Sequence, residues 1–233
     1  MDPLSWNLAL TALGLGVAHT AAGPDHTLPF VMLARARGWS LARTLGVTFA
    51  CGLGHIGSSL LLGMLGLALG VGVSRLGEVE SARGEMAAWG LVLFGAAYAL
   101  WGIRRALRRR GGIVLHEHRG HLHLHPRGDA HHHHPEEEKG RTTFWVLFTV
   151  FVLGPCEPLI PLFVLPASIG RWGAAALTGV VFAVATLATM LLVVGLALTG
   201  FRRIPLGFLA RWSHALAGGT IAASGLAVLW LGL

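Results

Sequence analysis

The sequence contains few charged residues and almost no cysteine. Only 12% of its 233 residues are Asp, Glu, Lys or Arg, about half of the roughly 25% that is usual in a soluble domain. These charges gather between long apolar stretches, and 54% of the residues are hydrophobic. The composition therefore excludes an ordinary soluble enzyme and indicates a chain whose solvent is lipid. Its two cysteines, Cys51 and Cys156, exclude a disulfide framework.

The net charge of +7 does not indicate nucleic-acid binding. The arginines lie beside apolar segments, where positive charge orients a membrane protein. The N-terminus has no positively charged stretch before its first apolar run, so no cleaved signal peptide is predicted. We expect the first apolar segment to remain in the mature protein.

Six stretches approach the length of about 20 apolar residues that a helix needs to cross a bilayer. The first and fourth are interrupted by the pairs Gly23-Pro24 and Gly154-Pro155, and proline removes a backbone donor and clashes with the preceding turn. We therefore expect an all-α integral membrane protein with six transmembrane helices, of which the first and fourth are broken. The six predicted spans are Trp6–Ala34, Leu41–Val73, Ala87–Ile103, Phe144–Ile169, Trp172–Gly200 and Phe208–Gly232.

The two Gly-Pro breaks belong to an internal repeat. Residues 23–30 (GPDHTLPF) align with residues 154–161 (GPCEPLIP), and Trp39 corresponds to Trp172 farther along. Each half holds three spans, and an odd number makes the second half enter from the opposite side. The prediction is an inverted repeat, whose substrate site lies near the midplane where discontinuous helices meet. The expected units are a first repeat (1–103), a cytoplasmic His-rich loop (104–143) and a second repeat (144–233).

Arginine placement predicts the orientation of the chain. Arginines follow the first, third and fifth spans, whereas the alternate loops have fewer or are diluted by glutamate. The positive-inside rule then places both termini outside the cytoplasm and the loop 104–143 inside it.

Asp25 and Glu157 are the acidic residues predicted to lie inside the spans. The other acids, Glu80 among them, are predicted at the terminus or in loops, and so is Arg83. Apart from Arg43 and Arg211, which lie close to the start of their spans, no lysine or arginine is predicted within a span to neutralise the two acids. A charge at that depth costs roughly 2.5 kcal/mol or more. The predicted intramembrane histidines are His19, His26 and His55, and a metal cation would satisfy acids and histidines together.

The donor set indicates a divalent transition metal. Imidazole and carboxylate suit Ni²⁺, Co²⁺, Zn²⁺ or Fe²⁺, and Cys156 adds a softer ligand. Other roles stay open at this point: Asp25 as a cap of the restarted helix, Glu157 as a proton-coupling carboxylate, and His19 or His55 as hydrogen-bonding residues between helices.

Nine of the 13 histidines lie between residues 116 and 134. Such a tract suits the capture or sensing of transition metals, and its polar composition predicts disorder until metal binds. It is also where a cytoplasmic metal carrier would dock.

These motifs resemble the nickel/cobalt transporter superfamily, in particular its six-span group of urease-accessory-like permeases and nickel/cobalt efflux proteins. The resemblance rests on His19 with residues 23–26 (GPDH), on Gly54-His55 and on residues 154–158 (GPCEP). It implies metal binding by His19, Asp25, His26 and His55, and a His-rich cytoplasmic loop is common in the efflux members. The Gly-Pro pair before Asp25 departs from the larger uptake members, which leaves transport direction and metal identity open.

The sequence thus predicts a transporter without enzymatic activity and without a permanently bound cofactor, in the plasma (inner) membrane of a bacterium. Its cargo would be Ni²⁺ or Co²⁺, with Zn²⁺ or Fe²⁺ as alternatives, moved by alternating access with an affinity that falls as histidine protonates. Two other functions stay open: a membrane thiol-disulfide electron carrier using Cys156, and a non-transporting accessory subunit. The oligomeric state is open too. The predicted metal site comprises His19, Asp25, His26, His55, Cys156 and Glu157.

Overall fold

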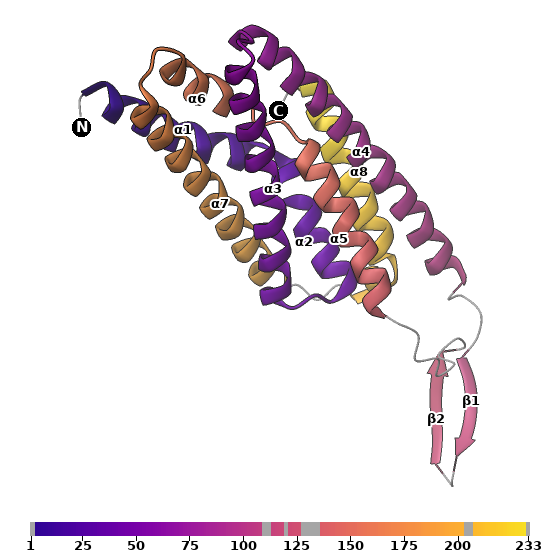
Figure 1. The fold of residues 1–233 in the computed structure, drawn as a ribbon. Coiled ribbons are helices and arrows are strands. Elements are labelled where there is room, and N and C mark those ends of the chain that lie inside the picture. The colour runs from indigo at the N-terminus through magenta and orange to yellow at the C-terminus, as the bar shows by residue number, and fades with distance from the viewer. Residues whose placement is uncertain (1–2, 109–112, 119–120, 127–135, 203–206, 232–233) are drawn as a thin grey trace.

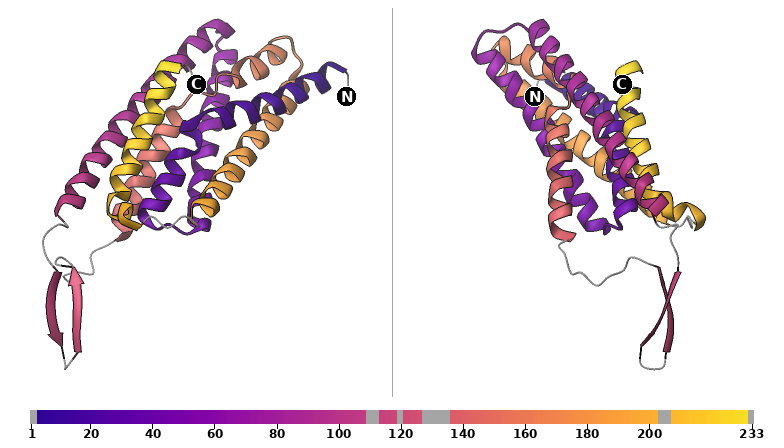
Figure 2. Two further views of the ribbon diagram at one scale, coloured as in Figure 1. Left: turned by 180° about the vertical axis from the view of Figure 1, so that it is seen from behind. Right: turned by 90° about the vertical axis from the view of Figure 1, so that its right-hand side faces the viewer.

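Helices form most of the described chain, which in this computed structural model comprises residues 3–108, 113–118, 121–126, 136–202 and 207–231. They pack into one bundle, and both termini lie at the end of it away from a β-hairpin (Figures 1 and 2). The elements are α1 (Pro3–Ala22), the 3-10 turn η1 (Pro24–His26), α2 (Leu28–Arg37), α3 (Leu41–Ala68), α4 (Val73–Arg108), β1 (Ile113–His118), β2 (His121–Pro126), α5 (Glu136–Leu153), α6 (Leu159–Ser168), α7 (Trp172–Arg202), the 3-10 turn η2 (Gly207–Trp212) and α8 (Ser213–Leu231).

Four helices of the described part are long and apolar enough to cross a membrane. These segments are Leu41–Ala68, Val73–Arg108, Trp172–Gly200 and Ala210–Leu231, and two shorter apolar helices cover Thr142–Leu153 and Leu159–Ser168. On α7 the apolar side chains of Val180, Val184, Leu192 and Leu196 are each at least 61% exposed. Their spacing of four or eight places them on one helix face, and lipid is the solvent that would cover such a face.

The expected breaks at both Gly-Pro pairs are confirmed. Helix α1 ends before Gly23, whose N–H still donates to the His19 carbonyl at 3.0 Å. Helix α5 ends before Gly154, whose N–H donates to the Val150 carbonyl at 2.9 Å. The next residue in each case is a proline, which has no N–H with which to continue the helix.

Helices α4 and α8 approach each other closely through glycine. A Cβ atom on Gly95 would meet the backbone of Gly218 and Ala222, and one on Gly218 would meet the backbone of Gly95 and Ala99. Small residues allow such backbone contact between membrane helices. The contact fixes α4 beside the centre of the bundle, which positions the residues described below.

The expected start of the third span is wrong. Helix α4 begins at Val73 instead of Ala87, so residues 73–86 are helical and part of the bundle. The expected loop also contains secondary structure: α4 continues to Arg108, and β1 pairs with β2 so that His116 lies opposite His123 and His118 opposite His121. His131 to His134, which belong to the predicted metal-capturing tract, lie outside the described residues.

Candidate metal centre

Three histidines from separate elements converge in the middle of the bundle. His19 lies in the last turn of α1, His26 ends η1, and His55 lies in the middle of α3. One ring nitrogen of each lies within 4.8 Å of the other two, and the Nε2 atoms of His26 and His55 are 3.4 Å apart. Nitrogen ligands on a tetrahedral metal at about 2.0–2.1 Å are about 3.3–3.4 Å from one another. The spacing of this pair therefore already suits a shared metal ion.

Asp25 orients the ring of His26. Its Oδ1 atom lies 3.1 Å from His26 Nδ1, and the His26 side chain is almost completely buried. A metal-binding histidine commonly donates its second ring N–H to a carboxylate, which fixes the tautomer. With Nδ1–H donated to Asp25, the lone pair of His26 Nε2 faces His55.

A backbone carbonyl orients His55 in the corresponding way. His55 Nδ1 lies 3.3 Å from the carbonyl oxygen of Phe151. In a continuous helix that carbonyl would accept from the N–H of residue 155, which is Pro155 and has none. The Phe151 carbonyl accepts from the Gly154 N–H at 3.1 Å, and because Pro155 has no N–H its second lone pair can accept from His55 Nδ1–H. Nε2 of His55 then keeps its lone pair toward His26.

The glycine of each break makes room for one of these rings. A Cβ atom on Gly154 would lie 3.1 Å from His55 Nδ1, and a Cβ atom on Gly23 would overlap the His26 ring. The absence of a side chain at these two positions lets the breaks approach the histidines. Both members of each Gly-Pro pair therefore serve the centre, the proline by freeing the chain from the helix and the glycine by its lack of a Cβ.

The third histidine has an unpaired nitrogen. His19 Nε2 is buried and has no hydrogen-bond partner within the described chain, and the same holds for the hydroxyl of Thr186. A buried polar atom without a partner costs about 1–3 kcal/mol. A cation held by the three imidazoles would remove this cost at His19.

Two cavities adjoin the histidines. The smaller, of about 30 Å³, is lined by the three histidines together with Asp25 and Phe151, and has the size of about one or two water molecules. The larger, of about 390 Å³, is also lined by His19 and includes the exposed acids Glu85 and Glu157. A hydrated cation therefore has room beside His19, next to carboxylates that attract it.

Cys156 and Glu157 lie outside the group of three histidines. Cys156 is buried in an apolar cluster with Leu159 and Phe182. Glu157 is exposed and lines the larger cavity. Like Cys156, Cys51 is a buried cysteine that forms no disulfide, and it belongs to a different apolar cluster. Of the six predicted site residues, the structure brings together His19, His26 and His55, with Asp25 directly behind His26.

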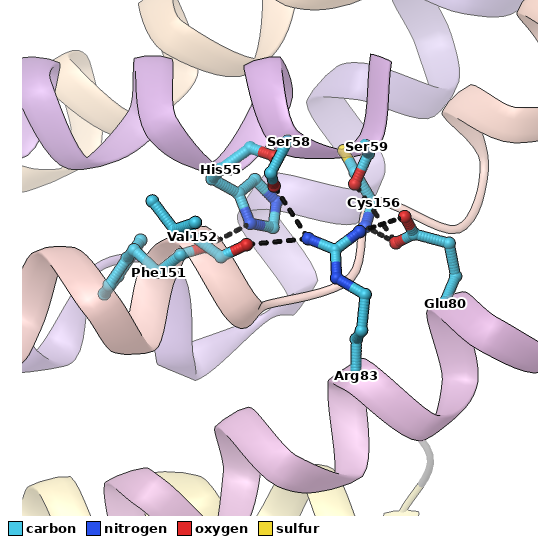
Figure 3. Close-up of polar contacts among 8 residues, drawn as sticks. All are labelled: His55, Ser58, Ser59, Glu80, Arg83, Phe151, Val152 and Cys156. Carbon is cyan, nitrogen blue, oxygen red and sulfur yellow. Dashed lines mark hydrogen bonds and ion pairs between the residues drawn. The ribbon is translucent and has the colours of Figure 1, made fainter. Parts of the chain in front are cut away.

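The expectation that Glu80 and Arg83 lie in a loop is wrong. Both are on α4, where Glu80 is completely buried and forms an ion pair with Arg83 (Figure 3). A signal was present, because the buried positions Leu76, Glu80, Gly84 and Leu91 continue one helical period through this segment. The charged residues in the segment concealed it.

No protein-family model, curated protein or solved structure matches this chain. A function therefore rests on the geometry of the site. That geometry consists of three converging imidazoles, two of them oriented through their second nitrogen, beside a cavity lined by acids.

Proposed function

We propose that this chain is a membrane transporter of a divalent transition-metal cation that binds at His19, His26 and His55. The observation that carries the proposal is the convergence of three imidazoles whose ligating nitrogens lie within 4.8 Å of one another. Imidazole ligands favour metals from Fe²⁺ to Zn²⁺ over Mg²⁺ and Ca²⁺, which prefer oxygen. Within that range the resemblance of the motifs favours Ni²⁺ or Co²⁺ as cargo, with Zn²⁺ and Fe²⁺ as alternatives.

The proposed architecture is six passes arranged as two inverted repeats. In this arrangement α1 with α2, and α5 with α6, each form one interrupted pass. The pairing of helices supports it: α1 packs on α7 as α5 packs on α3, and α2 packs on α8 as α6 packs on α4. Exchanging the two halves maps these four contacts onto one another, which agrees with a twofold internal repeat; the inversion is part of the proposal.

The larger cavity is the proposed entrance to the centre. Its lining includes Val228 and Leu229 near the end of α8, and Ser81 and Glu85 in the first half of α4. These segments belong to the end of the bundle that bears both termini (Figure 1). By the positive-inside rule that end faces away from the cytoplasm, so this conformation would be open to the outside.

Loading of the site would replace water by protein ligands. The cation would enter a cavity bordered by Glu85 and Glu157, whose negative charges raise its local concentration. The three imidazoles would then take the place of part of its hydration shell. The carboxylate of Asp25, which is hydrogen-bonded to His26, would stabilise the bound positive charge. Alternating access would next close this cavity and open a path toward the hairpin side, where the His-rich segment would meet the ion or a carrier.

Flux measurements on purified protein test the proposal. Proteoliposomes containing only this chain are expected to move Ni²⁺ or Co²⁺, and His26→Ala to abolish the flux because it removes a central ligand. His214→Ala is the matched control, since His214 lies on α8 and its Nδ1 is 2.8 Å from the Tyr98 hydroxyl instead of in the centre. Absence of flux in the unchanged protein, or full flux in His26→Ala, would overturn the proposal.

Deleting the His-rich segment tests its role separately. Removal of residues 115–135 leaves the described bundle intact, so we expect binding at the three histidines to persist. Changes in cellular metal accumulation and in metal sensitivity then report the direction of transport. A deletion that abolishes binding by the purified protein would contradict the placement of the site in the bundle.

A further inference from the structure

A charged pair lies buried between helices beside the metal centre. Glu80 is completely buried, its partner Arg83 is largely so, and both belong to α4. A buried ion pair is destabilising unless further hydrogen bonds satisfy both groups, and ionisable residues at membrane depth are retained for function. The partners of this pair therefore indicate what it does (Figure 3).

The pair replaces a hydrogen bond that the second break removes. In a continuous helix the N–H of Cys156 would donate to the carbonyl of Val152, four residues earlier. The break separates these two groups. Glu80 Oε2 accepts from Cys156 N–H at 3.0 Å, and Arg83 Nη2 donates to the Val152 carbonyl at 2.6 Å. The negative member thus satisfies the orphaned donor and the positive member the orphaned acceptor.

The same pair also contacts α3 next to His55. Arg83 Nη2 donates to Ser58 Oγ at 2.7 Å, and Ser58 Oγ donates to the His55 carbonyl at 2.8 Å. Ser59 Oγ donates to Glu80 Oε2 at 3.1 Å. The pair therefore holds the helix that carries His55 against the break whose carbonyl orients the ring of His55.

We propose that Glu80 and Arg83 are positioning residues for the cation centre. They stabilise the non-helical backbone of the second break by binding Cys156 N–H and the Val152 carbonyl. The neighbouring Phe151 carbonyl then stays in place to accept from His55 Nδ1. Loss of either member leaves orphaned backbone groups in an apolar bundle, and the break then rearranges to satisfy them. The inference rests on the proposed function in one respect, namely that the cation binds at the three histidines.

Co²⁺ titration of the purified full-length chain, followed by visible absorption, tests this role. Glu80→Met and Arg83→Met remove the acceptor and the donor at similar side-chain length, and they are expected to weaken Co²⁺ binding about 10- to 100-fold, the range for loss of groups that orient a metal ligand. Their spectra should change in the same direction as that of His55→Ala. Glu78→Met and Arg75→Met, at exposed positions of the same helix, are the matched controls and should match the unchanged protein.

A charge exchange separates hydrogen bonding from simple charge pairing. Glu80→Arg combined with Arg83→Glu retains an ion pair, but arginine at position 80 cannot accept from Cys156 N–H and glutamate at 83 cannot donate to Val152. This double variant should remain defective. Arg83→Lys keeps the charge and a donor without the planar fork, so it should bind Co²⁺ with intermediate affinity and serves where Glu80→Met does not fold.

The outcomes distinguish this inference from the proposed function. If the unchanged protein binds no Co²⁺, the proposed function fails. If it binds Co²⁺ and Glu80→Met or Arg83→Lys lowers only the thermal stability, with an unchanged affinity and spectrum, the pair is merely structural and this inference is overturned. Full recovery of affinity in the charge exchange would overturn it as well. Weakened binding with a spectrum like that of His55→Ala supports it.

Discussion

Replacing Gly154 by alanine tests how the second break supports His55. The new Cβ would lie 3.1 Å from His55 Nδ1 and 3.2 Å from the Phe151 carbonyl oxygen, which are the donor and the acceptor of one hydrogen bond. That bond is already 3.3 Å long, and a donor–acceptor distance of about 3.6 Å no longer counts as a hydrogen bond. A displacement of a few tenths of an ångström therefore breaks it.

The expected magnitude follows from the loss of this single bond. Removing a group that orients a metal-binding histidine typically weakens metal binding about 10- to 100-fold, which corresponds to about 1.4–2.8 kcal/mol. Because His19 and His26 keep their positions, we expect Gly154→Ala to fall in this range and to bind Co²⁺ more tightly than His55→Ala, which loses the ligand itself.

Co²⁺ titration with a matched control provides the assay. Gly57→Ala is the control, because Gly57 lies two residues from His55 on α3 and a Cβ there meets no atom within 4 Å. It should bind Co²⁺ like the unchanged protein. Equal affinities for Gly154→Ala and Gly57→Ala, together with loss of binding in His55→Ala, would refute the argument that the Phe151 carbonyl orients the ring.

Other substitutions and conditions give shorter tests. Cys156→Ser should leave Co²⁺ affinity and flux unchanged, because the polar contact of Cys156 with the network uses its backbone N–H; loss of flux together with redox activity of the thiol would favour electron transfer. Asp25→Asn should weaken binding about tenfold by removing the charge behind His26, with a titration as the measurement. Glu157→Gln should raise the KM for flux without lowering the affinity of the centre, because Glu157 lines the larger cavity. Lowering the pH from about 7.5 to about 5.5 should weaken Co²⁺ binding, since protons compete for imidazole nitrogens; an affinity independent of pH would argue against histidine ligands.

The helix breaks and the three histidines could be predicted from the sequence because their signals are local. Proline stops a helix wherever it lies, so Pro24 and Pro155 mark the breaks without knowledge of the fold. An ionisable histidine is costly in an apolar stretch and therefore rare there, so each one is easily recognised in the sequence. Both signals depend only on neighbouring residues, and both led to elements that meet in space.

Glu80 and Arg83 could not be found by the same reasoning, since a search for uncharged stretches discards any segment that contains charges. Their charges are satisfied by each other and by groups more than 20 residues away, such as Ser59 and Cys156. Such compensation is a property of the packed bundle. The helical period of the apolar residues around Glu80 was the remaining local signal. It persists through the charged segment because the buried face of α4 continues there.

The two breaks support the centre by different chemistry, although their sequences are related. The first supplies side chains: His26 is a proposed ligand, and the carboxylate of Asp25 lies against its second ring nitrogen. The second supplies backbone: the carbonyl of Phe151 orients His55, while the side chains of Cys156 and Glu157 lie elsewhere. A backbone carbonyl can serve this way only if the rest of the break is satisfied by other groups. That requirement explains why a buried ion pair lies against the second break, and it implies that the second break is more sensitive to added volume at its glycine than to the identity of the side chain at position 156.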